Sequence, residues 1–382
     1  MTVPSAHPDG DLEDSDVLAE PPPETASPPG PLTGRARTLA AIRHELADRL
    51  PVDAISVEPV AEIAAHLGIA PEEVLGRLGI DGRNVSAPYT GEVRRPAGEY
   101  APGTVWTEWG TPSTGDYGTA RYVPFRPDMT VRDVERYAWP SPADYDYSAA
   151  AETARRLDPT YAVRGPYWKP VFCRVCDLWG MEEAMAVVAL RPAVFEAALE
   201  RVLEVTLAYC RRLLDACGEH QAILCLGDDF ATQRGLMISP QAWRRFLKPA
   251  YARLFSLGKE RGLPVWFHSC GDVTTVLGDL IDIGMDVWET VQLHTLPISP
   301  ETLKREYGRH LTFFGGINTQ RLPFSTPEAV CDEVRRTIAV LGEGGGYICG
   351  PDHHIKPDVP PANAVALFDA ATSFRRPGYT RG

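Results

Sequence analysis

The sequence predicts an α/β protein, and specifically a (β/α)8 TIM barrel. After residue 160, short apolar runs alternate with segments of helical periodicity, and this alternation builds a parallel sheet, either closed or open. No Gly-x-Gly-x-x-Gly motif follows any apolar run, which disfavours an open dinucleotide-binding sheet. Polar residues gather directly after the runs, where barrel enzymes carry their active sites. We therefore expect a closed barrel.

The chain divides into three regions. Residues 1–33 hold eight of the 35 prolines and seven acids but no Lys or Arg, which predicts a disordered acidic tail. Residues 34–100 predict a helical extension that leads into the barrel, with helices over 39–46, 60–67 and 71–78. Residues 101–376 predict the barrel itself, whose earlier strands we expect from the loop-rich stretch of residues 80–165.

The later part of the barrel follows from the apolar runs and the periodic segments between them. Strands are expected over 171–175, 222–226, 264–267, 286–290, 311–314 and 346–349. Helices are expected over 181–217 with a break at Arg191-Pro192, and over 240–261, 273–283, 300–307 and 327–341.

Charge and composition exclude several classes of protein. The net charge is −13, and the acidic tail contributes −7 of it, so the rest of the chain carries −6. An acidic chain argues against a nucleic-acid partner. No apolar stretch approaches the ~18 residues of a membrane span, and the first residues do not resemble a secretory signal. Eight scattered cysteines in 382 residues indicate reduced thiols, so we expect a cytoplasmic protein.

Polar side chains follow five successive predicted strands, and their convergence on one face predicts an active site. They are Asp228 and Asp229, His268 and Cys270, Glu289 and Gln292, Asn318 and Gln320, and His353.

The pair His268-x-Cys270 predicts a metal site. Residues i and i+2 of a strand point the same way, so an imidazole and a thiolate could hold one ion, and zinc suits these ligands best. His353 is the best placed third ligand, with Cys349 in reserve. The alternative is structural: His268 forms a hydrogen bond with a neighbouring loop, and Cys270 packs against the turn at Gly271.

Two other motifs have a structural explanation beside a functional one. Asp228 and Asp229 either serve the chemistry, or cap the next helix or pair with an Arg such as the nearby Arg234. Cys173-x-x-Cys176 has the spacing of a redox or zinc pair, but it lies in an apolar run without a second pair, which favours core packing.

These motifs together resemble the uroporphyrinogen decarboxylase superfamily. The resemblance extends from about residue 108 to 371 and rests on residues 227–230 (Gly-Asp-Asp-Phe), 238–240 (Ile-Ser-Pro), 267–271 (Phe-His-Ser-Cys-Gly), 281–286, 315–320 and 346–361. It implies a (β/α)8 barrel with a cleft at the carboxyl ends of the strands. The Arg-rich amino-terminal motif by which the decarboxylases grip a tetrapyrrole is missing here.

A second branch of the superfamily consists of zinc-dependent methyltransferases that act with corrinoid proteins. They resemble this chain at His268-x-Cys270, and they carry a later Cys two residues after a Pro. Here Pro351-Asp352-His353 places His at that position. The decarboxylases also have a His there, so the residue does not separate the branches.

The resemblance implies a zinc-dependent methyltransferase that activates a thiol or similar acceptor, with a corrinoid on a partner protein as methyl donor. In this interpretation Asp228, Asp229 and Gln320 orient the acceptor, and Tyr347 or Trp288 packs against it. Substrate contacts are also expected from Glu289, Gln292 and Asn318. The alternative is a cofactor-free decarboxylase of a tetrapyrrole or other carboxylated aromatic, in which the acids stabilise a protonated ring and His353 handles protons. A mere binding module is the weakest interpretation.

Overall fold

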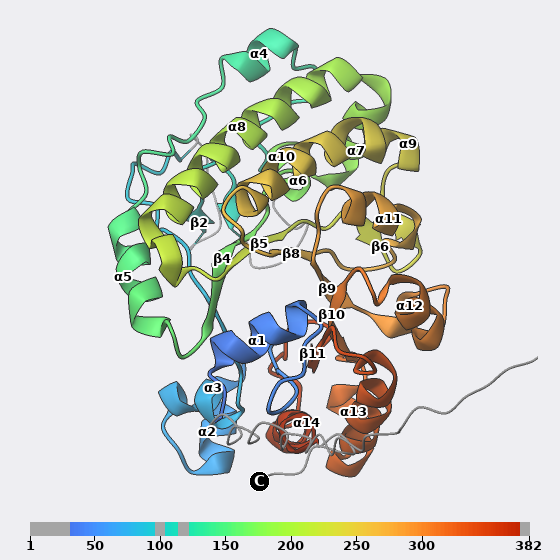
Figure 1. The fold of residues 1–382 in the computed structure, drawn as a ribbon. Coiled ribbons are helices and arrows are strands. Elements are labelled where there is room, and N and C mark those ends of the chain that lie inside the picture. The colour runs from blue at the N-terminus through green and yellow to red at the C-terminus, as the bar shows by residue number, and fades with distance from the viewer. Residues whose placement is uncertain (1–30, 96–103, 114–121, 375–382) are drawn as a thin grey trace, which may run out of the picture.

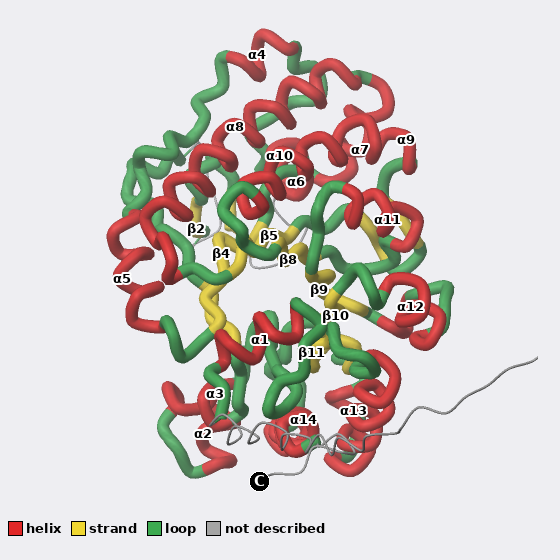
Figure 2. The backbone as a smooth tube through the Cα atoms, in the orientation of Figure 1, coloured by secondary structure: helices red, strands yellow, loops and turns green. Residues whose placement is uncertain are grey.

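The computed structural model describes residues 31–95, 104–113 and 122–374. Its centre is a seven-stranded parallel sheet in the order β1-β4-β5-β8-β9-β10-β11, which curls into a ring (Figure 2). The strands are β1 (Gly82–Asn84), β4 (Ala162–Trp168), β5 (Ile223–Gly227), β8 (Val265–His268), β9 (Val287–Val291), β10 (Thr312–Ile317) and β11 (Tyr347–Pro351).

An extended segment, residues 51–57, closes the ring between β11 and β1. Val52 and Val57 form parallel bridges with Cys349 and Ile355, and the Asp81 amide donates to the Val52 carbonyl at 2.9 Å. The predicted (β/α)8 barrel is thereby confirmed. Two parts of its wall, the segment of residues 51–57 and strand β1, lie before residue 101, within the region expected as an extension.

Helices cover the outside of the ring (Figure 1), whereas α1 (Gly34–Ile42) closes its amino-terminal end, where Thr312 at the start of β10 donates to the Ala41 carbonyl. The other helices are α2 (Val60–Leu67), α3 (Val74–Arg77), α4 (Val131–Glu135), α5 (Tyr147–Leu157), α6 (Phe172–Trp179), α7 (Met181–Leu190), α8 (Pro192–Cys217), α9 (Pro240–Ala242), α10 (Lys248–Lys259), α11 (Thr274–Asp282), α12 (Pro300–Tyr307), α13 (Pro327–Leu341) and α14 (Pro361–Ser373).

Short elements complete the chain. They are the two-stranded pairs β2 (Val105–Trp106) with β3 (Pro112–Ser113) and β6 (Ala231–Thr232) with β7 (Gly235–Leu236), the single turns η1 (Pro71–Glu73), η2 (Gly218–His220), η4 (Leu293–Thr295) and η5 (Leu322–Phe324), and the π-helical turn η3 (Trp243–Leu247).

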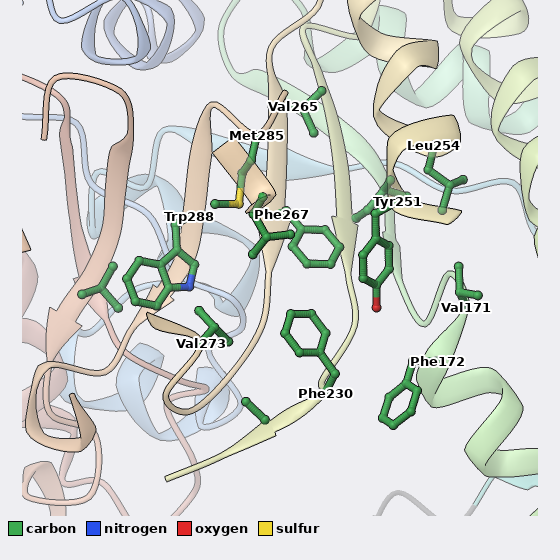
Figure 3. Packing of buried hydrophobic residues seen from close by; sticks show 14 of the residues in the cluster. Val171, Phe172, Phe230, Tyr251, Leu254, Val265, Phe267, Val273, Met285 and Trp288 are labelled. Carbon is green, nitrogen blue, oxygen red and sulfur yellow. The ribbon is translucent and has the colours of Figure 1, made fainter. Parts of the chain in front are cut away.

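Apolar clusters lie on both faces of the sheet, and a further small one packs α5 and α8 against β4. The inner core fills the barrel and includes Cys225 and Trp266, while the outer core lies beneath the helices. Figure 3 shows part of the outer core, where Tyr251 of α10 faces Phe267 of β8 with ring centroids 5.0 Å apart. Because alternate strand residues point inward and outward, parity along each strand decides which side chains reach the barrel interior.

The observed elements agree with most of the sequence prediction. Five of the six predicted apolar runs are strands, and the helix break at Arg191-Pro192 separates α7 from α8. The run 171–175 is instead the start of helix α6, and the first helix ends at Ile42, leaving Leu46 64% exposed. Most of the predicted tail lies outside the described residues. No helix among the described residues is both long and apolar enough to cross a membrane.

Candidate metal centre at the barrel mouth

Three potential ligands meet at the carboxyl ends of β5 and β8. They are Asp229, His268 and Cys270, whose ligand atoms all lie within 4.8 Å of one another. Nε2 of His268 lies 3.3 Å from Sγ of Cys270 and 3.5 Å from Oδ1 of Asp229. The side chains of His268 and Cys270 therefore lie on the same side of the strand end, as their i, i+2 spacing predicts.

The barrel interior fixes the orientation of the His268 ring. Nδ1 lies 2.8 Å from Oε1 of Glu289, which is fully buried, and Nε1 of Trp266 donates to the other carboxylate oxygen. Because a carboxylate only accepts hydrogen bonds, Nδ1 carries a hydrogen and Nε2 is the atom that faces Cys270 and Asp229. A carboxylate behind the imidazole is the usual support of a metal-bound histidine.

The electrostatics favour a positive charge at Nε2. Burial by itself lowers the pKa of His268, but Cys270, Asp229 and Glu289 outweigh burial and raise this pKa well above its usual value. Burial raises the pKa of Asp229, whereas its contacts with His268 and the Cys270 amide outweigh burial and lower it overall. The site thus surrounds one position with acidic groups, and a proton or a metal ion satisfies them.

Two of the three spacings between ligand atoms fit zinc. Zinc bonds of about 2.0–2.3 Å at tetrahedral angles separate ligand atoms by roughly 3.3–3.8 Å, and Nε2 of His268 lies 3.3 and 3.5 Å from the other two ligand atoms. Those two atoms lie within 4.8 Å of each other. Three protein ligands leave one tetrahedral position open, which is typical of a catalytic zinc site.

A cavity of about 430 Å³ opens beside the candidate metal centre, and we call it the first cavity. Cys270 forms part of its wall, and Phe324, 88% exposed, stands at its rim. The described lining residues are Ala231, Thr232, Gln233, Cys270, Gly271, Gln292, Thr319, Gln320, Pro323, Phe324, His353, His354, Lys356, Asp358 and Val359.

His353, the third ligand expected from the sequence, does not belong to the group of three, and Asp229 takes that place. The His353 ring lines the first cavity and lies edge-on to His354, with centroids 4.6 Å apart. Burial, followed by the charges of His354 and His268, lowers the pKa of His353 to about 4. The imidazole is therefore neutral near pH 7.

Asp228 proves to be a helix cap, not an acid at the mouth as expected. Its carboxylate is fully buried and accepts hydrogen bonds from the amides of Val171, Phe172 and Cys173 at 3.1, 2.6 and 2.7 Å, and from the Tyr251 hydroxyl at 3.0 Å. These amides belong to the first turn of α6, whose unpaired N–H groups attract an acid. The catalytic role expected for Asp228 is therefore corrected to a structural one.

Four other expected side chains are absent from the described lining of the first cavity. Glu289 sits behind His268 as described, and not at a substrate surface. Tyr347 and Trp288 belong to the outer core, where the Tyr347 hydroxyl donates to the Gly315 carbonyl at 2.7 Å. Cys349 is also buried there, and burial raises its pKa to about 12. The substrate contacts assigned to Glu289 and Tyr347 are wrong for this geometry.

The amides differ in their positions. Gln292 and Gln320 line the first cavity, and Oε1 of Gln292 accepts from the Gly271 amide at 2.8 Å. Asn318 is absent from the described lining, and its Oδ1 instead accepts from the Gln320 amide at 2.9 Å. Asn318 thus shapes the loop that presents Gln320.

A buried ion pair inside the barrel escaped the sequence analysis. Both guanidinium ends of Arg164 bond to Asp53, and the two side chains are almost fully buried. The guanidinium lies over the Trp266 ring, 4.7 Å from its centroid, so the pair supports the residue that holds Glu289. The sequence does contain an indication of this pair. Arg164 stands in an apolar stretch, at a position that points into the barrel once residues 162–168 form strand β4.

The family follows from comparison with known proteins. The family model "Uroporphyrinogen decarboxylase (URO-D)" matches residues 117–374, about two thirds of the chain. The chain belongs to the URO-D family. This match confirms the superfamily that the sequence motifs indicate.

URO-D relatives include both methyltransferases and decarboxylases. Methylcobamide:CoM methyltransferase MtaA of Methanosarcina barkeri is 23% identical over 354 residues, 90% of this chain and 98% of the relative. Uroporphyrinogen decarboxylase of Coxiella burnetii is 22% identical over 265 residues, 65% of this chain and 68% of the relative.

A solved structure supports the fold. A methyltransferase from Methanosarcina mazei superposes with a TM-score of 0.64 at 19% identity, over 89% of this chain and 98% of that one.

Proposed function

We propose that this URO-D protein is a zinc-dependent methyltransferase that moves a methyl group from a corrinoid on a partner protein to a thiol or similar acceptor. One observation carries the proposal: the potential ligand atoms of Asp229, His268 and Cys270 lie within 4.8 Å of one another, and the first cavity opens beside them. The methylcobamide:CoM methyltransferase MtaA of Methanosarcina barkeri supports the same chemistry, because the match extends over 98% of its length.

Zinc held by these residues would lower the pKa of a thiol acceptor, so that the acceptor reacts as a thiolate near neutral pH. The methyl group would form its bond to the acceptor sulfur, the electron pair of the cobalt–carbon bond would stay with the corrinoid, and the thiol proton would leave.

The residues of the chain prepare this step in three ways. Glu289 holds Nδ1 of His268, so that Nε2 keeps its direction. Gln292 fixes the Gly271 amide and with it the turn after Cys270. His353 lines the same cavity with its imidazole neutral near pH 7, because burial and the charges of His354 and His268 lower its pKa to about 4.

Decarboxylation of a carboxylate-rich ring is the second candidate, because the family model and the Coxiella burnetii relative carry that name. Several carboxylates require several cations. Among the described residues of the first cavity, Lys356 is the one Lys or Arg. The donor set and the lining therefore favour methyl transfer.

Elemental analysis of protein purified without chelator tests the proposal. We expect about one zinc per chain in the wild type, and loss of zinc in His268→Ala, Cys270→Ser and Asp229→Asn with the fold retained. His353→Gln and Cys349→Ala are the matched controls and should keep zinc. Metal-free wild type that decarboxylates its substrate would overturn the proposal. Zinc loss in His353→Gln but not in Asp229→Asn would show that His353, and not Asp229, is the third ligand.

A further inference from the structure

The two cysteines of the Cys173-x-x-Cys176 motif have different surroundings, although both lie in α6 and each is 3% exposed. Cys176 belongs to the outer core, as predicted from the sequence. Cys173 is absent from the apolar clusters that the described residues form. Its thiol instead meets the backbone of Asp229, just beyond the end of β5. Core packing therefore accounts for one cysteine of the motif and not for the other.

The Cys173 thiol bonds to the backbone on both sides of the Asp229 Cα atom. The Asp229 amide donates to Sγ at 3.2 Å, and the thiol donates to the Asp229 carbonyl at 3.4 Å. A thiol is a weak donor and a weak acceptor, and here one sulfur serves in both ways toward a single residue. Burial, followed by the charges of Asp228 and Asp229, raises the pKa of Cys173 well above its usual value, so the thiol keeps the hydrogen that it donates.

The helical turn that carries Cys173 is itself fixed to the end of β5. The Asp228 carboxylate accepts a hydrogen bond from the Cys173 amide at 2.7 Å, together with those from the amides of Val171 and Phe172. Asp228 therefore caps α6, and α6 in turn supplies the thiol that holds the next residue, Asp229. Because the two contacts run in opposite directions between the same two segments, neither segment can shift without breaking both.

The Asp229 side chain extends from this fixed backbone to the candidate metal centre. Its Oδ1 accepts from the Cys270 amide at 2.8 Å and lies 3.5 Å from Nε2 of His268. Cys173 is not one of the three potential ligands, so its influence on the centre passes through Asp229. Residues that orient a ligand in this way normally control metal affinity.

We propose that Cys173 is a positioning residue for Asp229: its thiol fixes the Asp229 backbone and thereby aims the carboxylate at His268 and Cys270. The consequence for zinc rests on the proposed function, whereas the hold on Asp229 does not. A cysteine that its apolar neighbours in the sequence assign to the core thus takes part in the candidate site.

Hydrogen exchange in the full chain after chelator treatment, followed by NMR, tests the hold itself. Cys173→Ala removes the acceptor of the Asp229 amide, which should exchange about fivefold faster or more than in the wild type. Cys176→Ala removes an equally buried thiol from the same helix and should leave exchange at Asp229 unchanged. Cys173→Val fills the space of the thiol without forming a hydrogen bond, and it replaces Cys173→Ala if that variant does not fold.

Metal binding tests the consequence of the hold. Cys173→Ala should weaken zinc binding about tenfold or more, and it should change the visible absorption of the cobalt-substituted protein, which depends on ligand geometry. Cys173→Ser restores a group that both donates and accepts, so it should return affinity and absorption towards those of the wild type. Cys176→Ala should change neither, even where it lowers stability, because its thiol lies in the outer core.

Unchanged exchange at Asp229 in Cys173→Ala, or an equal change in Cys176→Ala, would overturn the hold. Faster exchange with wild-type zinc affinity and cobalt absorption would overturn the positioning role and leave the zinc centre standing. Wild type that binds no zinc, combined with faster exchange in Cys173→Ala, would count against the proposed function and leave Cys173 as the residue that fixes Asp229.

Discussion

Glu289 and His268 form the contact that organises the candidate metal centre: Oε1 of Glu289 lies 2.8 Å from Nδ1 of His268. Trp266 donates to the other oxygen of Glu289, and Arg164 covers the Trp266 ring. The orientation of Nε2 is therefore set by packed residues inside the barrel and not by the loops of the mouth, and such supporting residues normally control metal affinity.

Glu289→Gln should lower zinc affinity by roughly 10–100-fold while the protein stays folded. An amide has one acceptor oxygen in place of two, so it cannot serve both His268 and Trp266, and it lacks the negative charge that supports a cation at Nε2. Competition with a chromophoric chelator measures the affinity. Glu58→Gln removes an exposed carboxylate at the same mouth and should leave affinity unchanged. Equal affinities in wild type and Glu289→Gln would reject the supporting role.

The two adjacent acids should behave in opposite ways. Asp228→Asn places an amide N–H₂ among the N–H donors of α6 or against Tyr251, and should lower the free energy of unfolding by about 1–3 kcal/mol without removing zinc. Asp229→Asn should remove zinc and change stability little in chelator-treated protein. Urea unfolding combined with metal analysis measures both. Zinc loss in Asp228→Asn at unchanged stability would restore the catalytic role that the sequence suggested.

Strand parity accounts for the part of the candidate site that the sequence predicts. The i, i+2 spacing of His268 and Cys270 places both side chains on one side of the end of β8, and they meet there. The same rule applied to β11 places Tyr347 and Cys349 on the outer side, because Ile348 between them belongs to the inner core. The same rule places Cys225 on the inner side of the sheet and Asp228 on the outer side.

Other features depended on contacts between distant residues, which a single sequence does not display. The run 171–175 is as apolar as a strand, but Asp228, 55 or more residues away, accepts its amides and starts a helix there. Residues 51–57 show no clear strand alternation, yet they close the barrel against Cys349. The barrel itself was predictable because its later strands and helices alternate in short, regular units.

The ion pair inside the barrel should be important for stability. Asp53→Ala leaves the guanidinium of Arg164 buried without its counter-charge and should lower the free energy of unfolding by about 3–5 kcal/mol. Asp369→Ala breaks the exposed pair with Arg77, whose side chains are 45% and 49% exposed, and should cost less than about 1 kcal/mol. Denaturant unfolding of the two variants compares them. Similar losses in both would show that Arg164 finds another partner or water.

The lowered pKa of His353 predicts acid sensitivity. Burial, with the charges of His354 and His268, lowers this pKa from 6.5 to about 4. Between these values the unfolded chain binds the proton more readily than the folded one, so stability is complete above pH 6.5 and falls as the pH falls towards 4. Unfolding of chelator-treated protein at pH 7 and pH 5 should show a smaller acid-induced loss in His353→Gln than in wild type. Identical losses would show that His353 is not the residue that titrates.

The final prediction concerns the partner that the proposed function requires. Cys270 lies in the wall of the first cavity, so a protein that carries the methyl donor must seat its corrinoid over this opening, where Phe324 is 88% exposed. Aromatic side chains at the centre of an interface often dominate binding. Phe324→Ser should raise the KM for a methylated corrinoid protein about tenfold and leave kcat with free methylcobalamin unchanged. Leu190→Ser, at a site that is 79% exposed and does not line the first cavity, should change neither kinetic constant. Steady-state kinetics with the two donors decide the matter, because equal effects on both donors would place Phe324 in the substrate site and not at the docking surface.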